Sequence, residues 1–403
     1  MNIAGLAIGL AISIMLILFV VNELSYDKHF ANHKRIVRLL TVKNSDNGLI
    51  YNPKNLREAY IELPQNVPGV EAAVQLYNLY GVEVISEQKR FQHVKAQLAD
   101  PEFFKVFQMK FVEGNAETSL KSHDAAVLTR RYANIMFGSP EAAMNQVISI
   151  SKMHFVISGI VEELPKNTHF NFDVLGTTKA DPWLSKTGNG LELFTYYLIH
   201  EKSSLQKVRD DIESAYRTIL KPFGEGVGSK DIYGLTEMLG DVHLKSKASE
   251  SVGNVRFINI ITCLAFLILI IAVTNFINLY ITQGEKRMQE IGIRKSYGAQ
   301  ISDIVKQIFS EILIIVGIAF FIGFYLAVIS VPHFGNLIDK DIDFVQLLNP
   351  MFIITGLFLF VITVVLSAFY PAFYLSRFSP LEILGKRVKF SKRRLTAITV
   401  VFQ

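Results

Sequence analysis

Four long apolar runs dominate the pattern of hydrophobic and polar positions along the chain. They cover residues 3–21, a stretch within residues 257–281, residues 308–331 and residues 350–372. About 20 apolar residues in a helix cross the hydrocarbon layer of a membrane, and a helix satisfies its own backbone hydrogen bonds there. The first run carries no charge and is too long for a cleaved signal peptide. The pattern therefore predicts four transmembrane helices.

The segment between the first and second runs has a different pattern, in which short strand-like stretches alternate with loops and helices. An amphipathic helix is predicted over residues 205–220, and a hairpin over residues 147–161 with its turn at Lys152 and Met153. Further strands are predicted at residues 36–42, 82–86, 90–98 and 126–129. The predicted fold class is a membrane α-helical protein with four transmembrane helices and a large α+β domain between helices 1 and 2.

Composition and charge set the orientation of these parts. Half of the 403 residues are hydrophobic and 19% are charged, as expected for a protein that is part membrane and part water-exposed. The net charge of +5 arises from basic residues that collect after the second and fourth runs, and such residues favour the cytoplasmic side. We therefore expect residues 22–255 outside, and residues 282–307 and 373–403 inside. The single cysteine, Cys263, lies in the second run, so the outer domain has no disulfide.

The outer domain shows no strong sequence signal for a catalytic or ligand-binding site. The segment GEGVGSKD at residues 224–231 resembles a phosphate-binding loop, but Ser229 stands where Gly must precede the Lys, and Asp231 where Ser or Thr must follow it. The histidines lack metal-ligand spacing, and ordinary packing or surface roles are expected for His93, His123, His154, His169, His200 and His243. No clear basic face indicates nucleic-acid binding. We expect no catalytic residue, no metal and no cofactor, so the chain is not predicted to be an enzyme.

The connection between the second and third runs is unusual because apolar residues recur at helical spacing among its charges. Two interpretations are open: a helix that docks on a partner protein, and an amphipathic segment that lies in the lipid headgroups. Asn275 and Asn278 lie three residues apart in the second run, and we expect them to make polar contacts between membrane helices; a substrate path is the alternative. The periodic apolar positions of the connection are Met288, Ile291, Ile301, Ile304, Val305 and Ile308.

The stretch QEIGIRKSYGA at residues 289–299 closely resembles the hallmark of the MacB/FtsX-like permeases of ATP-binding-cassette (ABC) transporters. The segments DPEFFKVFQMKFVEGN and VISGIVEELPKNTHFNFDVL resemble the periplasmic core domain of that family, and SAFYPAFYLSRFSPLEILGK resembles its exit into the cytoplasm. The resemblance implies that a coupling helix docks on a cytoplasmic ATPase subunit. The docking residues it implies are Glu290, Ile291, Gly292, Arg294, Lys295, Gly298 and Ala299.

The resemblance also implies a domain organisation. The first transmembrane helix covers residues 1–21, a MacB-like periplasmic core domain residues 22–255, an FtsX-like permease domain residues 256–376 with a coupling segment at 285–307, and a basic tail residues 377–403. The short start and the tail, which resembles the approach to a further span, lead us to expect the front half of an eight-span member.

The resemblance implies a permease in a bacterial inner membrane, which couples ATP hydrolysis to movement of its periplasmic domain for efflux or for lipoprotein or peptide export. No Walker loop is present, so a separate ABC ATPase subunit is the expected partner. The lipid bilayer, a second permease half or a second copy, and periplasmic or outer-membrane proteins are further expected partners. Two alternatives are an FtsX-like regulator of envelope hydrolases and a transmembrane sensor or receptor.

Overall fold

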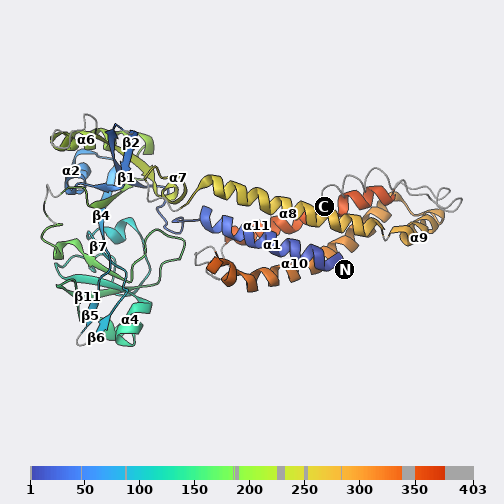
Figure 1. Cartoon of the computed structure of the whole chain (residues 1–403), viewed down its shortest axis with the longest axis horizontal. Coiled ribbons are helices and arrows are strands. Elements are labelled where there is room, and N and C mark those ends of the chain that lie inside the picture. Colours follow the sequence, from blue (N-terminus) through green and yellow to red (C-terminus); the bar gives the residue numbers. More distant parts are fainter. Residues whose placement is uncertain are drawn as a thin grey trace. The chain divides into compact units, whose positions relative to one another are not determined.

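The computed structural model describes residues 2–46, 48–86, 89–184, 186, 190–224, 232–248, 253–282, 284–337 and 350–376. The chain divides into two compact units (Figure 1). A membrane unit joins residues 1–24 to residues 255–403, and an outer unit comprises Ser25–Asn254. Each unit has its own core and is described separately.

The membrane unit consists of long apolar helices at the places where the hydropathy pattern predicts them. Four helices in the described part of the chain are long and apolar enough to cross a membrane. Each extends beyond its predicted run, because polar residues at the ends continue the helix outside the apolar stretch. Their bounds are α1 Asn2–Leu24, α8 Val255–Thr282, α10 Ile301–Leu337 and α11 Pro350–Ser376.

Helix α1 packs against both α8 and α10. Its contact with α8 is close because small residues face each other. A Cβ atom added to Gly9 would lie 2.3 Å from the Cβ of Ala272. One turn further along α1, the Ser13 hydroxyl donates a hydrogen bond to the carbonyl oxygen of Ala265 at 3.1 Å. Small residues allow the backbones of membrane helices to approach in this way, which strengthens dispersion and polar contacts between them.

The outer unit is built on one mixed sheet with the strand order β14-β1-β13-β4-β7-β12-β9-β11-β10-β5-β6. Most neighbouring strands are antiparallel, whereas β7 with β12 and β9 with β11 are parallel. The strands are β1 Ile36–Ser45, β2 Gly48–Asn52, β3 Lys54–Asn55, β4 Val70–Leu79, β5 Val84–Ser86, β6 Lys89–Phe91, β7 Ala96–Ala99, β8 Phe111–Glu113, β9 Ala125–Thr129, β10 Val147–Ile150, β11 Met153–Val161, β12 Val174–Thr177, β13 Leu193–Ile199 and β14 Ile232–Met238.

Helices cover this sheet on the sides where apolar side chains point. On one face of β1, β4 and β13, Val37 and Tyr197 pack with Leu63 of α2 and Ile212 of α6. The opposite face holds a cluster rich in phenylalanine, which includes Phe103 of α3. The outer unit's helices are α2 Arg57–Asn66, α3 Phe103–Val106, α4 Arg130–Phe137, α5 Pro140–Ala143, α6 Leu205–Gly224 and α7 Val242–Lys245, with 3₁₀ turns at Thr178–Ala180 and Leu239–Asp241.

Several predicted elements of the outer unit are present and two need correction. The predicted strand at residues 90–98 is two short strands, β6 and β7, separated by a bend in which His93 has φ +59°. The turn of the predicted hairpin lies at Ser151 and Lys152, one residue earlier than expected. Both residues have positive φ, which matches the twist of a tight two-residue hairpin. Residues 225–231 of the loop that resembles a phosphate site, and residues 377–403, lie outside the described residues.

Candidate functional site

The predicted coupling segment forms a short helix, α9 Gly284–Ser296, followed by a turn and then by α10. Gly298 ends α9 with φ +93°, in the left-handed region that glycine adopts without strain. The amides of Gly298 and Ala299 donate to the carbonyl oxygens of Lys295 and Arg294, at 3.0 and 3.1 Å. These two bonds form the Schellman motif that closes many helices. Helix α10 continues from this turn directly into the third apolar run.

The start of α10 is capped by its own sequence. The Gln300 amide donates to Oδ2 of Asp303 at 3.2 Å, as in one half of a capping box. The Asp303 carboxylate also lies in the first turn, where the helix dipole favours negative charge. The turn between α9 and α10 is therefore specified by local residues at both of its ends.

Arg294 links α9 to α10. Its Nη1 donates to Oε1 of Gln307 at 2.6 Å, and its Nη2 donates to Oε1 of Glu290 at 2.7 Å. Both charged side chains are about half exposed, so the ion pair contributes little to stability. Two predicted docking residues are thus partly engaged with each other on the surface of the segment.

Lys295 links α9 to the last described helix. Its Nζ donates to the carbonyl oxygen of Ser376, at the end of α11, at 2.6 Å. A cation at a helix C-terminus interacts favourably with the helix dipole and with carbonyl groups that lack a helical partner. Through Arg294 and Lys295, α9 is therefore attached to α10 and to α11 by side chains, in addition to its place in the chain.

The apolar residues of α9 divide into a buried and an exposed set. Ile291 is 8% exposed and Gly292 is also buried, so these two predicted docking residues pack inside the membrane unit. Ile293 and Tyr297, by contrast, are 51% and 88% exposed. Neither residue could be predicted from the sequence, because both lie off the periodic apolar face and nothing in the pattern distinguishes them. The side chains of residues 284–289, including Met288, lie outside the described part.

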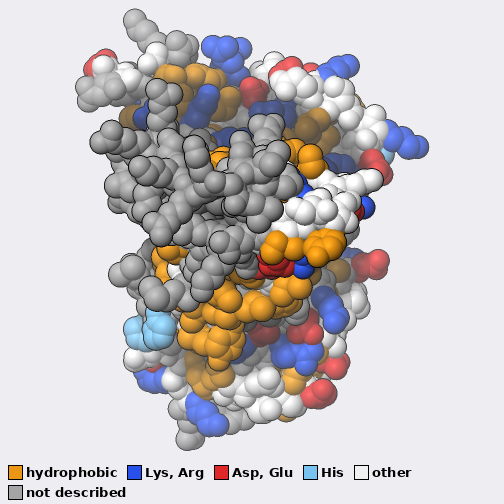
Figure 2. Space-filling view, turned by 90° about the vertical axis from the view of Figure 1, so that its right-hand side faces the viewer, with side chains coloured by type: hydrophobic (Ala, Val, Ile, Leu, Met, Phe, Trp, Pro, Cys, Tyr) orange, Lys and Arg blue, Asp and Glu red, His pale blue; other side chains and the backbone are white. Residues whose placement is uncertain are grey.

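Large apolar side chains are also exposed elsewhere on the membrane unit, among them Phe321 at 75% and Ile354 at 68%. Figure 2 shows a patch of hydrophobic side chains on the described part of the face that it presents. Lipid tails cover apolar side chains of membrane helices at no cost. Ile293 and Tyr297 differ from this set because they belong to the polar segment between two spans.

The predicted intramembrane contacts concern Asn275 and Asn278 of α8, both half-buried. A Cβ atom added to Gly5 of α1 would lie 3.6 Å from Nδ2 of Asn275, so this amide faces α1. The carbonyl oxygen of Asn278 accepts a hydrogen bond from the Thr282 hydroxyl within α8. The structure brings Asn275 to a helix interface and gives Asn278 this local bond; their functional roles remain predictions.

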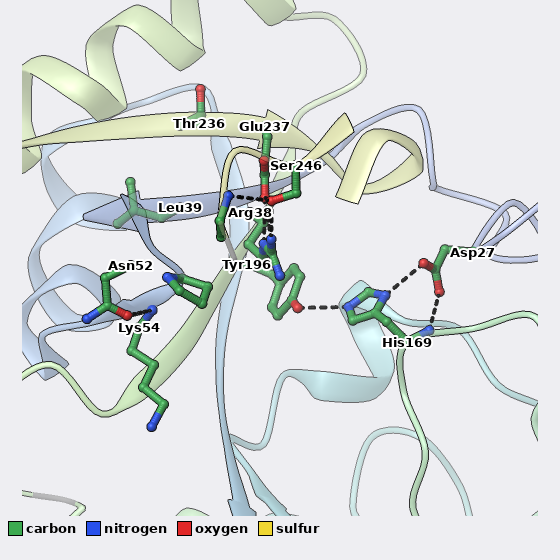
Figure 3. Close-up of polar contacts among 12 residues, drawn as sticks. Asp27, Arg38, Leu39, Asn52, Lys54, His169, Tyr196, Thr236, Glu237 and Ser246 are labelled. Carbon is green, nitrogen blue, oxygen red and sulfur yellow. Dashed lines mark hydrogen bonds and ion pairs between the residues drawn. The ribbon is translucent and has the colours of Figure 1, made fainter. Parts of the chain in front are cut away.

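The outer unit contains a second group of polar residues around His169, for which an ordinary packing or surface role was expected. The His169 ring lies between two partners, with Nδ1 2.8 Å from Oδ2 of Asp27 and Nε2 2.8 Å from the Tyr196 hydroxyl (Figure 3). Burial alone would raise the pKa of Asp27, but attraction to His169 and hydrogen bonds from His169 and Thr168 outweigh it and lower that pKa. Burial raises the pKa of Tyr196, which keeps its hydroxyl protonated.

Arg38 and Glu237 form a buried ion pair beside this group. They are cross-strand neighbours in β1 and β14, and Nε of Arg38 donates to Oε1 of Glu237 at 2.8 Å. Arg38 is 4% exposed, and its backbone is also the register partner of Tyr196 in β13. Sheet register therefore brings Glu237, Arg38 and Tyr196 into one row. Within the described residues, no group of three or more His, Cys, Asp or Glu side chains is arranged to hold a metal ion.

Comparison with known proteins places these features in a family. The sequence pattern of the MacB-like periplasmic core domain matches residues 1–215, and that of the FtsX-like permease C-terminal domain matches residues 262–380. Together with the four apolar helices around an α/β domain, they define a multi-pass permease of the ABC type, located in the inner membrane with a periplasmic domain. The chain belongs to the MacB-like family, because the first match covers more than half of it.

The relatives are similar over part of their length. The macrolide export ATP-binding/permease protein MacB of Campylobacter jejuni is 27% identical over 183 residues, which are 45% of this chain and 27% of the relative. MacB of Photorhabdus laumondii is 22% identical over 291 residues, 71% of this chain and 42% of the relative. The periplasmic region of MacB from Actinobacillus actinomycetemcomitans aligns with a TM-score of 0.37 at 14% identity, covering 52% of this chain and 90% of that structure.

Proposed function

We propose that this chain is a permease subunit that receives motion from a separate cytoplasmic ABC ATPase through α9 and passes it to the membrane helices. Family membership supports the ATPase as partner, since MacB/FtsX-like permeases work with one. The observation that carries the proposal is the construction of α9 itself. It is a short, capped helix whose side chains form hydrogen bonds with α10 and α11. It also leaves the large side chains of Ile293 and Tyr297 exposed on a polar segment.

The contacts of α9 suggest how force is transmitted. A displacement of α9 acts on α8 and α10 through the backbone, and on α11 through the bond from Lys295 to the Ser376 carbonyl. Arg294 adds a second link to α10 through Gln307. The short turn at Gly298 and the cap at Asp303 limit how far α9 bends relative to α10. A movement of α9 is therefore transmitted to three membrane helices, α8, α10 and α11.

Docking itself is assigned to Ile293 and Tyr297, with Glu290 and Arg294 at the margin. Buried aromatic side chains contribute most of the energy of many protein interfaces, whereas exposed charge pairs at the rim contribute little. An exposed fraction of 88% leaves nearly the whole Tyr297 side chain available to a partner. We therefore expect the tyrosine to be the principal anchor, and a charge reversal such as Glu290→Arg to weaken docking less.

The test is a photo-crosslinking experiment on the full chain in its native membrane. A photoreactive phenylalanine analogue replaces Tyr297, and the crosslinked product is identified by mass spectrometry. We expect a subunit with a Walker-type nucleotide site. Tyr297→Ala should then lower co-purification of that subunit by about tenfold or more, the effect of an interface anchor. Ser296→Ala is the matched control, because among the described residues the Ser296 hydroxyl bonds to the Gly292 carbonyl of its own helix. Crosslinking only to lipid would favour the headgroup interpretation and refute docking.

A further inference from the structure

Two adjoining cavities lie on the outer unit, over one face of its sheet. Their volumes are about 280 and 400 Å³, and both are lined by Asn78, Gln97, His169 and Asn171. Asn78 in β4 and Gln97 in β7 are directly paired in the sheet register, and Nε2 of Gln97 donates to Oδ1 of Asn78 at 2.8 Å. The register therefore places two amide side chains together where the two cavities meet.

Gln97 carries an unsatisfied polar atom. The residue is 9% exposed, and its Oε1 has no hydrogen-bond partner among the described residues. A buried acceptor without a partner costs about 1–3 kcal/mol. Gln75, on the opposite face of β4, shows the usual solution. Its Nε2 donates to the Leu56 carbonyl and to the Thr195 hydroxyl, and its Oε1 accepts from Arg57. The contrast marks the Gln97 oxygen as an acceptor that no other described residue satisfies.

The other polar groups of the first cavity are held in fixed positions. Asp27 and Tyr196 hold the His169 ring from both sides (Figure 3), and the ion pair with Glu237 fixes Arg38. Side chains held in this way need little further ordering when a ligand binds, which improves affinity. The ring of Tyr26 stacks on His243 at the edge of the same cavity, with 3.6 Å between ring centroids. The first cavity is therefore preorganised.

The second cavity is more open and has a different character. Tyr80 is 79% exposed, and its hydroxyl accepts a hydrogen bond from Nδ2 of Asn78 at 3.1 Å, which orients the ring. Lys95 and His93 also line this cavity. No Asp or Glu occurs among the described residues that line either cavity. The second cavity thus combines an exposed aromatic ring with positive charge.

These features narrow the class of ligand. A peptide that binds as an added strand needs a free strand edge. Beneath the cavities, β4 lies between β13 and β7, and β7 lies between β4 and β12. Neither strand therefore has a free edge to which a peptide strand could pair. Amide side chains both donate and accept hydrogen bonds, as a row of hydroxyl groups requires. An aromatic ring covers the apolar face of a sugar, and a lysine pairs with an anion.

We propose that the two cavities bind a saccharide that carries an acidic group. The hydroxyl groups of the sugar form hydrogen bonds with the side chains of Gln97 and Asn78, and its anionic group lies near Lys95. The saccharide belongs either to a soluble glycan or to the headgroup of a glycolipid, since both present the same chemistry. Binding takes place on the outer unit alone and does not depend on docking of an ATPase. Failure of one proposal therefore leaves the other standing.

The test uses the full chain in detergent and saturation-transfer NMR, which detects weak ligands. The probes are glucuronic acid, glucose and trialanine. We expect glucuronic acid to bind more tightly than glucose, and trialanine not to bind. Lys95→Met should remove the preference for glucuronic acid and leave glucose binding unchanged. Competition between soluble glucuronic acid and vesicles that contain glucuronosyl diacylglycerol distinguishes the two sources: strong displacement by vesicles indicates the headgroup.

The decisive comparison is between two glutamines. Gln97→Leu should weaken saccharide binding by about tenfold and lower the thermal stability only slightly, because it removes an unpaired oxygen together with the single bond from Nε2 to Asn78. Gln75→Leu should lower the thermal stability and keep the saccharide affinity, because all its bonds are internal. Binding of trialanine but of neither sugar, or full affinity in Gln97→Leu, would overturn the proposal.

Discussion

The two units of this chain differ in where they expose large apolar side chains. In the outer unit, large residues such as Phe103 and Tyr197 are fully buried between the sheet and its helices. In the membrane unit, large residues such as Phe321 lie on the outside, and α1 meets α8 through Gly9 and Ala272. Water drives apolar surface into a core, whereas lipid provides no such force and leaves close packing to hold helices together. The difference is the one expected between a unit surrounded by water and a unit surrounded by lipid.

Polar groups follow the same division. In the membrane unit, the buried hydroxyls of Ser13 and Thr363 bond to backbone carbonyls, that of Ser13 to Ala265 and that of Thr363 to Leu359 in its own helix. In the outer unit, polar side chains form networks across strands, such as the pair of Arg38 with Glu237. Charged groups are costly in hydrocarbon, whereas a partly wet cleft tolerates them when each has a partner. Four substitutions test this comparison.

The largest effect is expected at the buried ion pair of the outer unit. Arg38→Leu leaves the Glu237 carboxylate buried without its main partner, which should lower the free energy of unfolding by about 3–5 kcal/mol. Urea unfolding of the full chain in detergent, monitored by hydrogen exchange of the β1 amides, measures this loss. The double variant Arg38→Leu with Glu237→Leu removes both charges and should recover much of the loss. A loss below about 1 kcal/mol in the single variant would show that the pair is solvated.

The next largest effect is expected at the contact between α1 and α8. Gly9→Ala places a methyl group 2.3 Å from the Cβ of Ala272, so the helices must move apart, at a cost of up to about 3 kcal/mol. Thermal unfolding in detergent measures the loss. Gly317→Ala in α10 is the matched control, because no described atom beyond its own stretch of helix lies within 4 Å of its added Cβ. Ala272→Gly should restore the Gly9→Ala variant; a lack of restoration would mean that the strain lies elsewhere.

A moderate, pH-dependent effect is expected at Asp27. Asp27→Asn weakens charged hydrogen bonds with His169 and Thr168 and should lower the stability of the outer unit by about 2 kcal/mol near pH 7. Because the folded pKa of Asp27 is lowered, the advantage of the carboxylate is complete above roughly pH 4 and disappears as the pH falls through the folded value. Unfolding curves at several pH values measure it. An equal difference at acid and neutral pH would contradict the assignment.

The smallest effect is expected at the turn of the coupling segment. Gly298→Val forces a β-branched residue into φ +93° and should destabilise the end of α9 by about 1 kcal/mol or somewhat more. Faster hydrogen exchange of the Ala299 amide, which bonds to the Arg294 carbonyl, reports the change. Gly298→Asn should be milder, because asparagine tolerates left-handed backbone better. Equal exchange in both variants would indicate that the turn is held by other contacts.

Much of the architecture could be predicted from residue pattern. The apolar runs predicted all four long helices, because a span needs a continuous stretch that composition alone reveals. The amphipathic helix at residues 205–220 is present as α6, and the hairpin at residues 147–161 is present with its turn shifted by one residue. Strands β4, β13 and β14 were missed. Apolar side chains cover both faces of much of β4 and β13, so alternation, the signal used for strands, is largely absent.

Residue pattern was enough to predict the spans and the family, because each depends on neighbouring residues or on a contiguous motif. Three-dimensional packing was needed to show that Ile291 is buried while Tyr297 is exposed, and that Lys295 reaches the end of α11. It alone decided that Gln97 lies beside Asn78 with an unpaired oxygen. The physical reason is that burial and partnership depend on residues far apart in the chain, which only packing and strand register bring together.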